Sequence, residues 1–241
     1  MGTTHFFLNG KGGVGTSYTA SLLAQHYIAR NKRVLCVSTE PCGGNLRRYE
    51  AFNTKWFDIY CEDPSNPKSI DNLFKQILEM DDDAEVIVDC GSTSYLSICQ
   101  VLKAKGFLDE AQSFGKRILL HSIIVGGASC IEALNSYKSL LDNFADCKTI
   151  VWLNKYFGEV RIDGQNFEST KFYTHYSDRI DGIIPLGPEK DGPMAFDINR
   201  MLCDYLTYQE AITTSDYYVI TKSRLNMAWR DLNAKLDQVN L

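Results

Sequence analysis

The sequence has no apolar stretch long enough to cross a bilayer and no charged-then-apolar leader at its N-terminus. Proline is scarce, with 6 residues in 241, and no Pro/Ser-rich linker, internal repeat or low-complexity tract marks a domain boundary. These absences predict a cytoplasmic protein in which residues 1–241 form a single domain, since open α/β sheets commonly reach this length.

Positive charge is in deficit, because 25 Lys and Arg residues face 30 Asp and Glu residues and the formal net charge is −5. Broad, non-specific DNA binding needs a basic face, so direct DNA binding by the monomer is not expected, although a local basic patch stays open. Hydrophobic residues make up 44% of the chain, which is enough for the substantial core of an ordinary globular protein.

The chain also lacks the residue spacings of metal and redox sites. Its 8 cysteines include no C-x-x-C pair, and its 4 histidines lie far apart. We therefore expect free, mostly buried thiols rather than disulfides, zinc or an iron–sulfur cluster. His121 begins an apolar strand, where a hydrogen-bonded core histidine is commoner than a metal ligand.

Apolar, strand-like runs alternate with helix-periodic segments along the chain, which predicts an α/β fold with a mostly parallel, doubly wound sheet flanked by helices. Strands are expected at 5–8, 33–37, 85–89, 117–125, 148–153 and 179–184, with an edge strand within 54–60 and Pro185 closing the last one. Helices are expected at 17–31, 69–80, 94–105 and 129–143 and after the last strand. Asp163-Gly164 is a candidate hairpin turn.

A glycine-rich loop, Gly10-Lys11-Gly12-Gly13-Val14-Gly15-Thr16-Ser17, follows the first strand and opens the first helix. Glycines let the backbone curl until successive N–H groups converge on a phosphate at the positive end of a helix. The phosphate-loop spacing G-x-x-x-x-G-K-[ST] is met at Gly10, Gly15 and Ser17, but Thr16 stands where the motif has lysine. The loop predicts a nucleotide site, with Ser17 Oγ on Mg²⁺, that lacks its usual phosphate-binding cation.

Polar residues end three other expected strands, at the sheet edge where α/β proteins bind ligands. Asp89, before Cys90-Gly91, can hold a water of the Mg²⁺ shell, and Glu40, before Pro41, adds a second carboxylate. Asn154 can read an adenine edge together with the loop around Pro185–Gly187. The plainer alternatives are a turn-capping Asp, a solvated Glu and a turn-forming Asn.

Together these residues resemble the deviant Walker family of P-loop ATPases, the group that contains ParA and MinD. Its loop reads K-G-G-x-x-K-[ST], which the chain matches from Lys11 to Gly15 and at Ser17 but not at Thr16. The resemblance implies a ParA/MinD-like fold, ATP or ADP with Mg²⁺, and an ATP-dependent homodimer in which Lys11 reaches the partner's phosphates. By position Glu40 would polarise water, although Ser38-Thr39-Glu40-Pro41 departs from the family's D-x-D-P.

A closer resemblance, to the TraL/StbB proteins of conjugative plasmids, covers most of the chain. It is carried by residues 87–95, by HSIIVGG at 121–127, by VWLNKYFG at 151–158 and by Arg224-Leu225, in this order. The resemblance implies a cytoplasmic ATPase of plasmid transfer or maintenance that works with a plasmid-encoded partner protein, for which a DNA-binding protein is one candidate.

The missing lysine weakens the expected activity. Losing a charge-assisted hydrogen bond removes about 1.5–3 kcal/mol, roughly ten- to a hundredfold in affinity. We therefore expect weakened nucleotide binding and slow or absent hydrolysis, whether Thr16 is a deliberate replacement or part of a natural drift that includes Ser38 and Glu40. Two functions stay open: a nucleotide-dependent dimerising switch, and a pseudo-ATPase that acts as a protein-binding scaffold.

Apolar residues with helical spacing run through the C-terminal segment. They are Leu225, Ala228, Trp229, Leu232, Leu236 and Val239. Some MinD-like proteins touch a membrane through such a helix, but the charges here are mixed rather than basic. Packing against the body of the domain is therefore expected over membrane contact.

Overall fold

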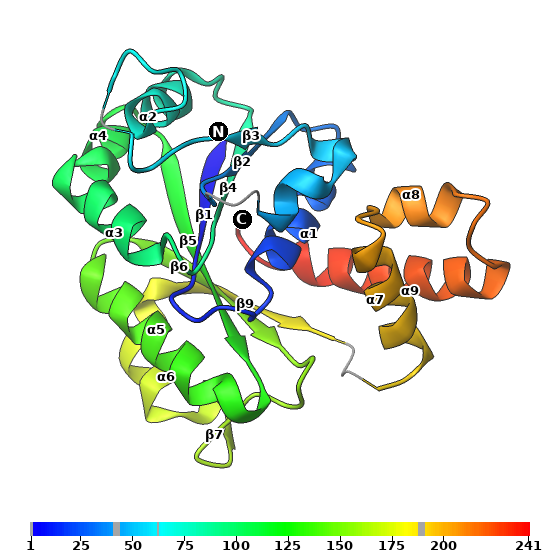
Figure 1. The fold of residues 1–241 in the computed structure, drawn as a ribbon. Helices are drawn as coiled ribbons and strands as arrows, with labels where there is room; N and C mark the ends of the chain where they lie inside the picture. The colour runs from blue at the N-terminus through cyan, green and yellow to red at the C-terminus, as the bar shows by residue number, and fades with distance from the viewer. Residues whose placement is uncertain (1, 41–43, 62, 188–190) are drawn as a thin grey trace.

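A seven-stranded, entirely parallel sheet with the order β3-β2-β4-β1-β5-β6-β9 forms the centre of the protein (Figure 1). The structure is a computed structural model that describes residues 2–40, 44–61, 63–187 and 191–241. The strands are β1 (Thr3–Leu8), β2 (Val34–Ser38), β3 (Lys55–Trp56), β4 (Glu85–Cys90), β5 (Arg117–Val125), β6 (Lys148–Asn154) and β9 (Ile180–Leu186). The predicted parallel α/β sheet is confirmed.

Helices cover both faces of this sheet (Figure 1). One side carries α1 (Thr16–Ile28), α7 (Pro193–Cys203), α8 (Tyr208–Thr213) and α9 (Val219–Leu236). The other carries α2 (Ile70–Glu79), α3 (Tyr95–Ala104), α4 (Phe107–Ser113), α5 (Cys130–Asn143) and α6 (Lys171–Tyr176). Short 3₁₀ turns are η1 (Asn45–Arg48), η2 (Glu50–Phe52), η3 (Gly127–Ser129), η4 (Phe167–Ser169) and η5 (Ser177–Arg179). The sheet is thus doubly wound.

The central strands are apolar because both of their faces are covered. Every residue of β1 and β4 is buried, and Phe6, Phe7 and Val88 are fully inaccessible. Sheets covered by helices on both faces need such continuous hydrophobic runs rather than alternating ones. The carboxyl ends of β1 and β4 lie side by side, with Phe7 opposite Asp89, and this pairing positions the candidate site.

The last strand continues past the point where the sequence predicted its end. β9 includes Pro185, which is opposite Leu153 in β6, and stops at Leu186. Proline lacks an N–H, but β9 is an edge strand that pairs on one side only, so its outer side needs no donor. The helix α4 is not predicted by the sequence pattern, because its 7 residues are too few to give a clear helical period.

Two local predictions are confirmed. A hairpin joins β7 (Arg161–Ile162) to β8 (Gln165–Asn166), and both turn residues, Asp163 and Gly164, have positive φ, as a type I′ turn requires. Near the C-terminus α9 packs on the domain through buried Leu225, Leu232 and Leu236.

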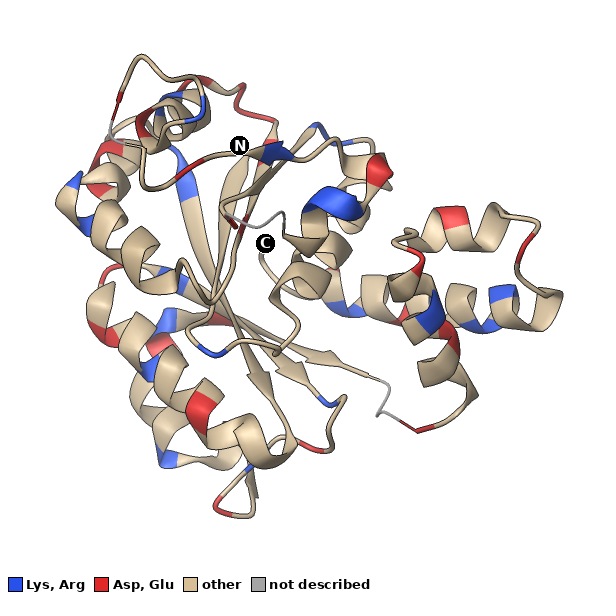
Figure 2. Ribbon diagram, in the orientation of Figure 1, with Lys and Arg blue, Asp and Glu red and all other residues tan. Residues whose placement is uncertain are grey.

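The surface charges and thiols also follow the composition. Figure 2 shows basic and acidic residues interspersed over the helices. The cysteines at 36, 61, 90, 99, 130, 147 and 203 are all free and mostly buried, as expected, whereas Cys42 lies outside the described residues. In the part of the chain that the structure describes, no helix is long and apolar enough to cross a membrane.

Candidate nucleotide-binding site

The glycine-rich loop connects β1 to α1 and is pinned at its start. Asn9 is fully buried, and its side chain both accepts from Ile123 N and donates to Ile123 O in β5, each at 3.0 Å. Gly10 N donates to Ser136 Oγ in α5 at 2.7 Å. A Cβ at Gly10 would lie 3.0–3.2 Å from side-chain atoms of Ser136 and Tyr95, so a larger residue would require those side chains to shift. The loop therefore leaves the sheet from a fixed point.

Two glycines turn the loop back into the helix. Gly13 and Gly15 have φ values of 76° and 100°, in the left-handed region that favours glycine. Gly15 is the N-cap of α1, and no side chain caps the first turn of this 13-residue helix. The N–H groups of that turn have no partner within the helix, and the helix dipole makes this end positive. Val14 is buried and anchors the loop. The loop thus has the geometry of an anion cradle.

A cleft of about 780 Å³ opens over this cradle. It brings together six residues predicted from the sequence: Gly12, Gly13, Gly15, Thr16, Ser17 and Glu40. The cleft also includes Arg48 and Ser92, which the sequence analysis missed. Arg48 lies on η1, well beyond the strand-end motifs, and no pattern in the sequence marks it.

Asp89 lies beneath the cleft as an unpaired acid. Its side chain is fully buried, and neither carboxylate oxygen has a hydrogen-bond partner among the described residues. Burial raises the pKa of Asp89 to about 6; the neighbouring Ser17 hydroxyl, although outside hydrogen-bonding geometry, opposes the rise, and the charge of Glu40 adds to it. A buried carboxylate without partners is costly unless a cation or donor completes it.

These residues fit a Mg²⁺ ion that arrives with a nucleotide. Asp89 offers two open oxygens, and Ser17 places a hydroxyl near them. Within the described ranges no group of three or more His, Cys, Asp or Glu side chains forms a metal site of its own. The remaining ligands would be phosphate oxygens and water, as Mg²⁺ prefers.

Glu40 is held on the wall of the cleft, as the strand-end position predicted. Thr93 Oγ1 donates to its carboxylate and lies 3.2 Å from both oxygens. The carboxylate fills the space that a Cβ at Gly91 would occupy, so the approach depends on that glycine. Pro41, the other half of the predicted pair, lies outside the described residues.

Asn154 contacts the loop itself. Its Nδ2 donates to Val14 O at 2.9 Å, and its Oδ1 accepts from Tyr156 N at 3.0 Å. With Leu186 and Gly187, Asn154 lines a cavity of about 270 Å³ beside the loop. Pro185 does not line this cavity but a neighbouring one. Asn154 therefore connects the loop to a mostly apolar cavity.

Lys11 turns away from the cleft. Its Nζ lies 2.7 Å from Glu132 Oε2 in α5, and both side chains remain partly or largely exposed to solvent. Exposed ion pairs of this kind contribute about 0–1 kcal/mol, so the contact is readily broken.

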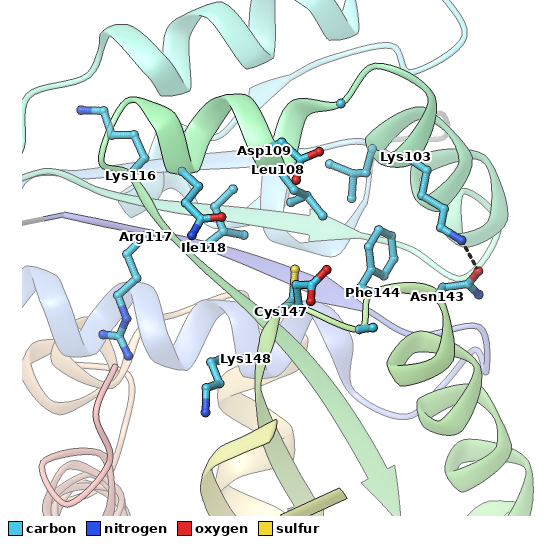
Figure 3. Close-up of a pocket in the computed structure, with 15 residues that line it drawn as sticks. Lys103, Leu108, Asp109, Lys116, Arg117, Ile118, Asn143, Phe144, Cys147 and Lys148 are labelled. Atoms are coloured by element: carbon cyan, nitrogen blue, oxygen red, sulfur yellow. Dashed lines mark hydrogen bonds between the residues drawn. The ribbon is translucent and has the colours of Figure 1, made fainter. Parts of the chain in front are cut away.

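Another cavity, of about 490 Å³, lies at the opposite ends of the strands (Figure 3). It is lined by basic residues that include Lys116 and Arg117, near the start of β5, and Lys148, at the start of β6. These side chains already donate to backbone oxygens, of Met80, Asn240 and Asp178 respectively, at 2.6–2.8 Å. The phosphate cradle and the unpaired acid are both absent from this part of the described structure, and we assign it no ligand.

No family model matches the chain. A protein named TraL from Escherichia coli is 30% identical over 238 residues, which are 98% of each chain. The chain belongs to the TraL family. A second Escherichia coli TraL is 29% identical over the same length. Among solved structures, the MinC:MinD cell division complex from Aquifex aeolicus is 16% identical, covers 99% of this chain and 97% of its own, and has a TM-score of 0.47. A score this low supports no argument about function.

Proposed function

We propose that this TraL-family chain is an adenine-nucleotide-dependent switch ATPase of conjugative plasmid transfer or maintenance, impaired in hydrolysis by Thr16. The observation that carries the proposal is Asp89, which is fully buried with two unpartnered oxygens close to Ser17 in the first turn of α1. An acid in that state destabilises the empty protein, and a Mg²⁺-nucleotide complex would satisfy it.

Each side chain of the site then has a role. Backbone N–H groups from Gly12 to Ser17 would hold the phosphates, and Ser17 Oγ and Asp89 would hold Mg²⁺, which neutralises phosphate charge when it is bound. Glu40, steadied by Thr93, would orient the attacking water. Thr16 supplies a hydroxyl without a charge, so the step in which charge develops on the phosphate is the one most weakened.

The direct test is titration of the purified protein with ATP, ADP and GTP, with and without Mg²⁺. We expect adenine nucleotides to bind, Mg²⁺ to strengthen binding, and Asp89→Asn to remove the Mg²⁺ effect. The matched control is Asp71→Asn on α2, because Asp71 is a partly exposed residue that forms an ion pair with Lys105 and lies outside the cleft. Absence of nucleotide binding, or a Mg²⁺ effect that persists without Asp89, would contradict the proposal.

The second candidate is a pseudo-ATPase that serves as a protein-binding scaffold. It is favoured by the pairing of Lys11 with Glu132, because this pairing directs Lys11 away from the phosphates. Since Thr16 occupies the other lysine position of the loop, neither position supplies a cation to the phosphates. Thr16→Lys separates the two functions, with Thr16→Ser as the control for substitution at this position. ATP turnover restored by lysine alone supports the impaired switch, and inactivity of a nucleotide-binding Thr16→Lys protein supports the scaffold.

A further inference from the structure

The phosphate cleft contains one basic side chain among its described lining residues, and that side chain is Arg48. The only acidic residue in the lining is Glu40, and Asp89 lies buried behind it. Lys11 is directed to Glu132 and is not part of the lining. An incoming phosphate therefore meets two carboxylates and only one side-chain cation.

Arg48 is held in place by Tyr205. Its Nη1 donates a hydrogen bond to the Tyr205 hydroxyl, and its Cζ lies 4.0 Å from the centre of the Tyr205 ring. Tyr205 itself has a left-handed φ of 53°, which is uncommon for an aromatic residue. The tyrosine follows α7, so residues far apart in the sequence fix this guanidinium at the rim of the cleft.

The guanidinium has donors to spare. It carries five N–H groups in a planar fork, and the bond to Tyr205 uses one of them. No other described residue accepts a hydrogen bond from Arg48. A planar fork matches the oxygens of a phosphate, and an arginine already stacked on an aromatic ring loses little freedom when it binds one.

We propose that Arg48 supplies the positive charge for the outer phosphates of a nucleoside di- or triphosphate that Thr16 cannot supply. The inference rests on the nucleotide site proposed above and adds a residue to it. Arg48 acts from the part of the cleft lining that η1 contributes, with Tyr205 as its positioning residue. The alternative is that Arg48 only stacks on Tyr205 and stabilises the contact between η1 and the end of α7.

Calorimetric titration with Mg²⁺ and either a non-hydrolysable ATP analogue or AMP distinguishes these two roles. Arg48→Met should weaken binding of the ATP analogue roughly ten- to a hundredfold, the range for a charge-assisted hydrogen bond. Binding of AMP should be unchanged, because AMP lacks the outer phosphates. Arg48→Lys, which keeps the charge but loses the fork, should give a smaller loss and guards against a folding defect in the methionine variant.

The matched control is Arg47→Met. Arg47 is the neighbouring residue of η1, faces Trp56 with its Cζ 6.0 Å from the ring, and does not line the cleft. Binding of the ATP analogue should be unchanged in this variant. In an Arg48→Met background, Thr16→Lys should restore affinity, because the lysine returns a charge to the phosphates.

Three results would overturn the inference, and they differ in what they imply for the proposed function. Unchanged affinity of Arg48→Met for the ATP analogue, in a protein that binds it, refutes the role of Arg48 and leaves the proposed function standing. An equal loss for the ATP analogue and AMP also refutes it, since a structural defect would weaken both. If the unsubstituted protein binds neither, the proposed function and the role of Arg48 fail together.

Discussion

His121 Nε2 and His5 Nδ1 lie 2.9 Å apart in the centre of the sheet, and both rings are fully buried. Trp152 Nε1 donates to His121 Nδ1 at 2.9 Å, so His121, when neutral, must carry its proton on Nε2 and donate it to His5. His5 then carries its proton on Nε2, which faces the Tyr27 hydroxyl at 3.1 Å. The prediction that His121 is a hydrogen-bonded core residue is confirmed, and every ring nitrogen of His5, His121 and Trp152 has a hydrogen-bond partner.

This pair should make the protein unstable in mild acid. Burial lowers the pKa of both histidines below the ordinary value of 6.5, so the unfolded chain binds protons that the folded chain does not. The contribution of the two neutral histidines to the free energy of unfolding is therefore complete above pH 6.5, and it falls as the pH drops from there towards the pKa values of the folded state. Each histidine removes about 1.4 kcal/mol per pH unit below 6.5. Urea denaturation at pH 7.5, 6 and 5 measures it.

The measurement is best made in an Asp89→Asn background, because Asp89 titrates in the same range with the opposite sign. His175→Gln is the control, since His175 is exposed and its loss should leave the pH profile unchanged. A free energy of unfolding that stays constant between pH 7.5 and 5 in that background would contradict the role of the buried pair.

Asp89 should destabilise the empty protein at neutral and alkaline pH. Its pKa is raised from 3.8 to about 6, so the folded state resists ionisation, and stability present below pH 4 is lost as the pH rises through 6. Asp89→Asn should therefore raise the free energy of unfolding at pH 8 by about 1–2 kcal/mol. The increase is limited because burying the asparagine amide also costs free energy. Thermal unfolding should show a clearly larger difference at pH 8 than at pH 4.5, where the folded carboxyl group is still mostly protonated.

With Mg²⁺ and ADP added, the order should reverse. The unsubstituted protein gains stability from the ligand, whereas the asparagine variant, without the carboxylate, gains less. A variant that is destabilised at pH 8 without ligand would show that Asp89 makes a stabilising contact in the empty protein.

Asn154 should matter more for adenine than for guanine nucleotides. Its Nδ2 keeps one N–H after the bond to Val14 O, and its Oδ1 keeps acceptor capacity after the bond from Tyr156 N. Asn154 lines the cavity beside the loop, so Asn154→Ala should weaken the binding of ATP by roughly tenfold and the binding of GTP by less. Competition titration with the two nucleotides measures the difference. Equal losses would mean that the side chain only holds the loop.

The sequence identified the parts of the site that depend on local pattern. The loop from Gly10 to Ser17, Glu40 and Asp89 follow strand ends, and strand ends of a parallel sheet meet at one edge. The residues Gly12, Gly13, Gly15, Thr16, Ser17 and Glu40 do line one cleft, and Asp89 is buried close to Ser17 and Glu40, whereas Lys11 pairs with Glu132 outside the lining.

Contacts between distant segments were not predictable in the same way. Arg48 is placed by Tyr205, 157 residues away, and Lys11 is drawn to Glu132 on α5. Neither pair leaves a periodic signal, because the partner depends on how the helices lie on the sheet. The prediction that Pro185 closes the last strand was wrong for a related reason. A proline usually interrupts a strand that pairs on both sides, and only the sheet order reveals that β9 is an edge strand.

Lys11 should control any ATP-dependent dimer, and Glu132 should oppose it. The Lys11–Glu132 pair holds the lysine within its own subunit at 2.7 Å, but the pair is exposed and weak, so a partner's phosphate can compete for the charge. In a Thr16→Lys background with a non-hydrolysable ATP analogue, Lys11→Ala should abolish the dimer. Glu132→Gln should strengthen it by up to about thirtyfold, because dimerisation breaks one such pair in each subunit and a surface ion pair contributes at most about 1 kcal/mol.

Sedimentation velocity over a range of protein concentrations measures both effects. Lys138→Ala is the control, because Lys138 also lies on α5 and pairs with an acid, Asp142, but does so away from the loop. A dimer that persists unchanged without Lys11 excludes the bridging role. If Lys11→Ala abolishes the dimer while Glu132→Gln leaves its affinity unchanged, the lysine bridges but the pair within the subunit does not restrain it.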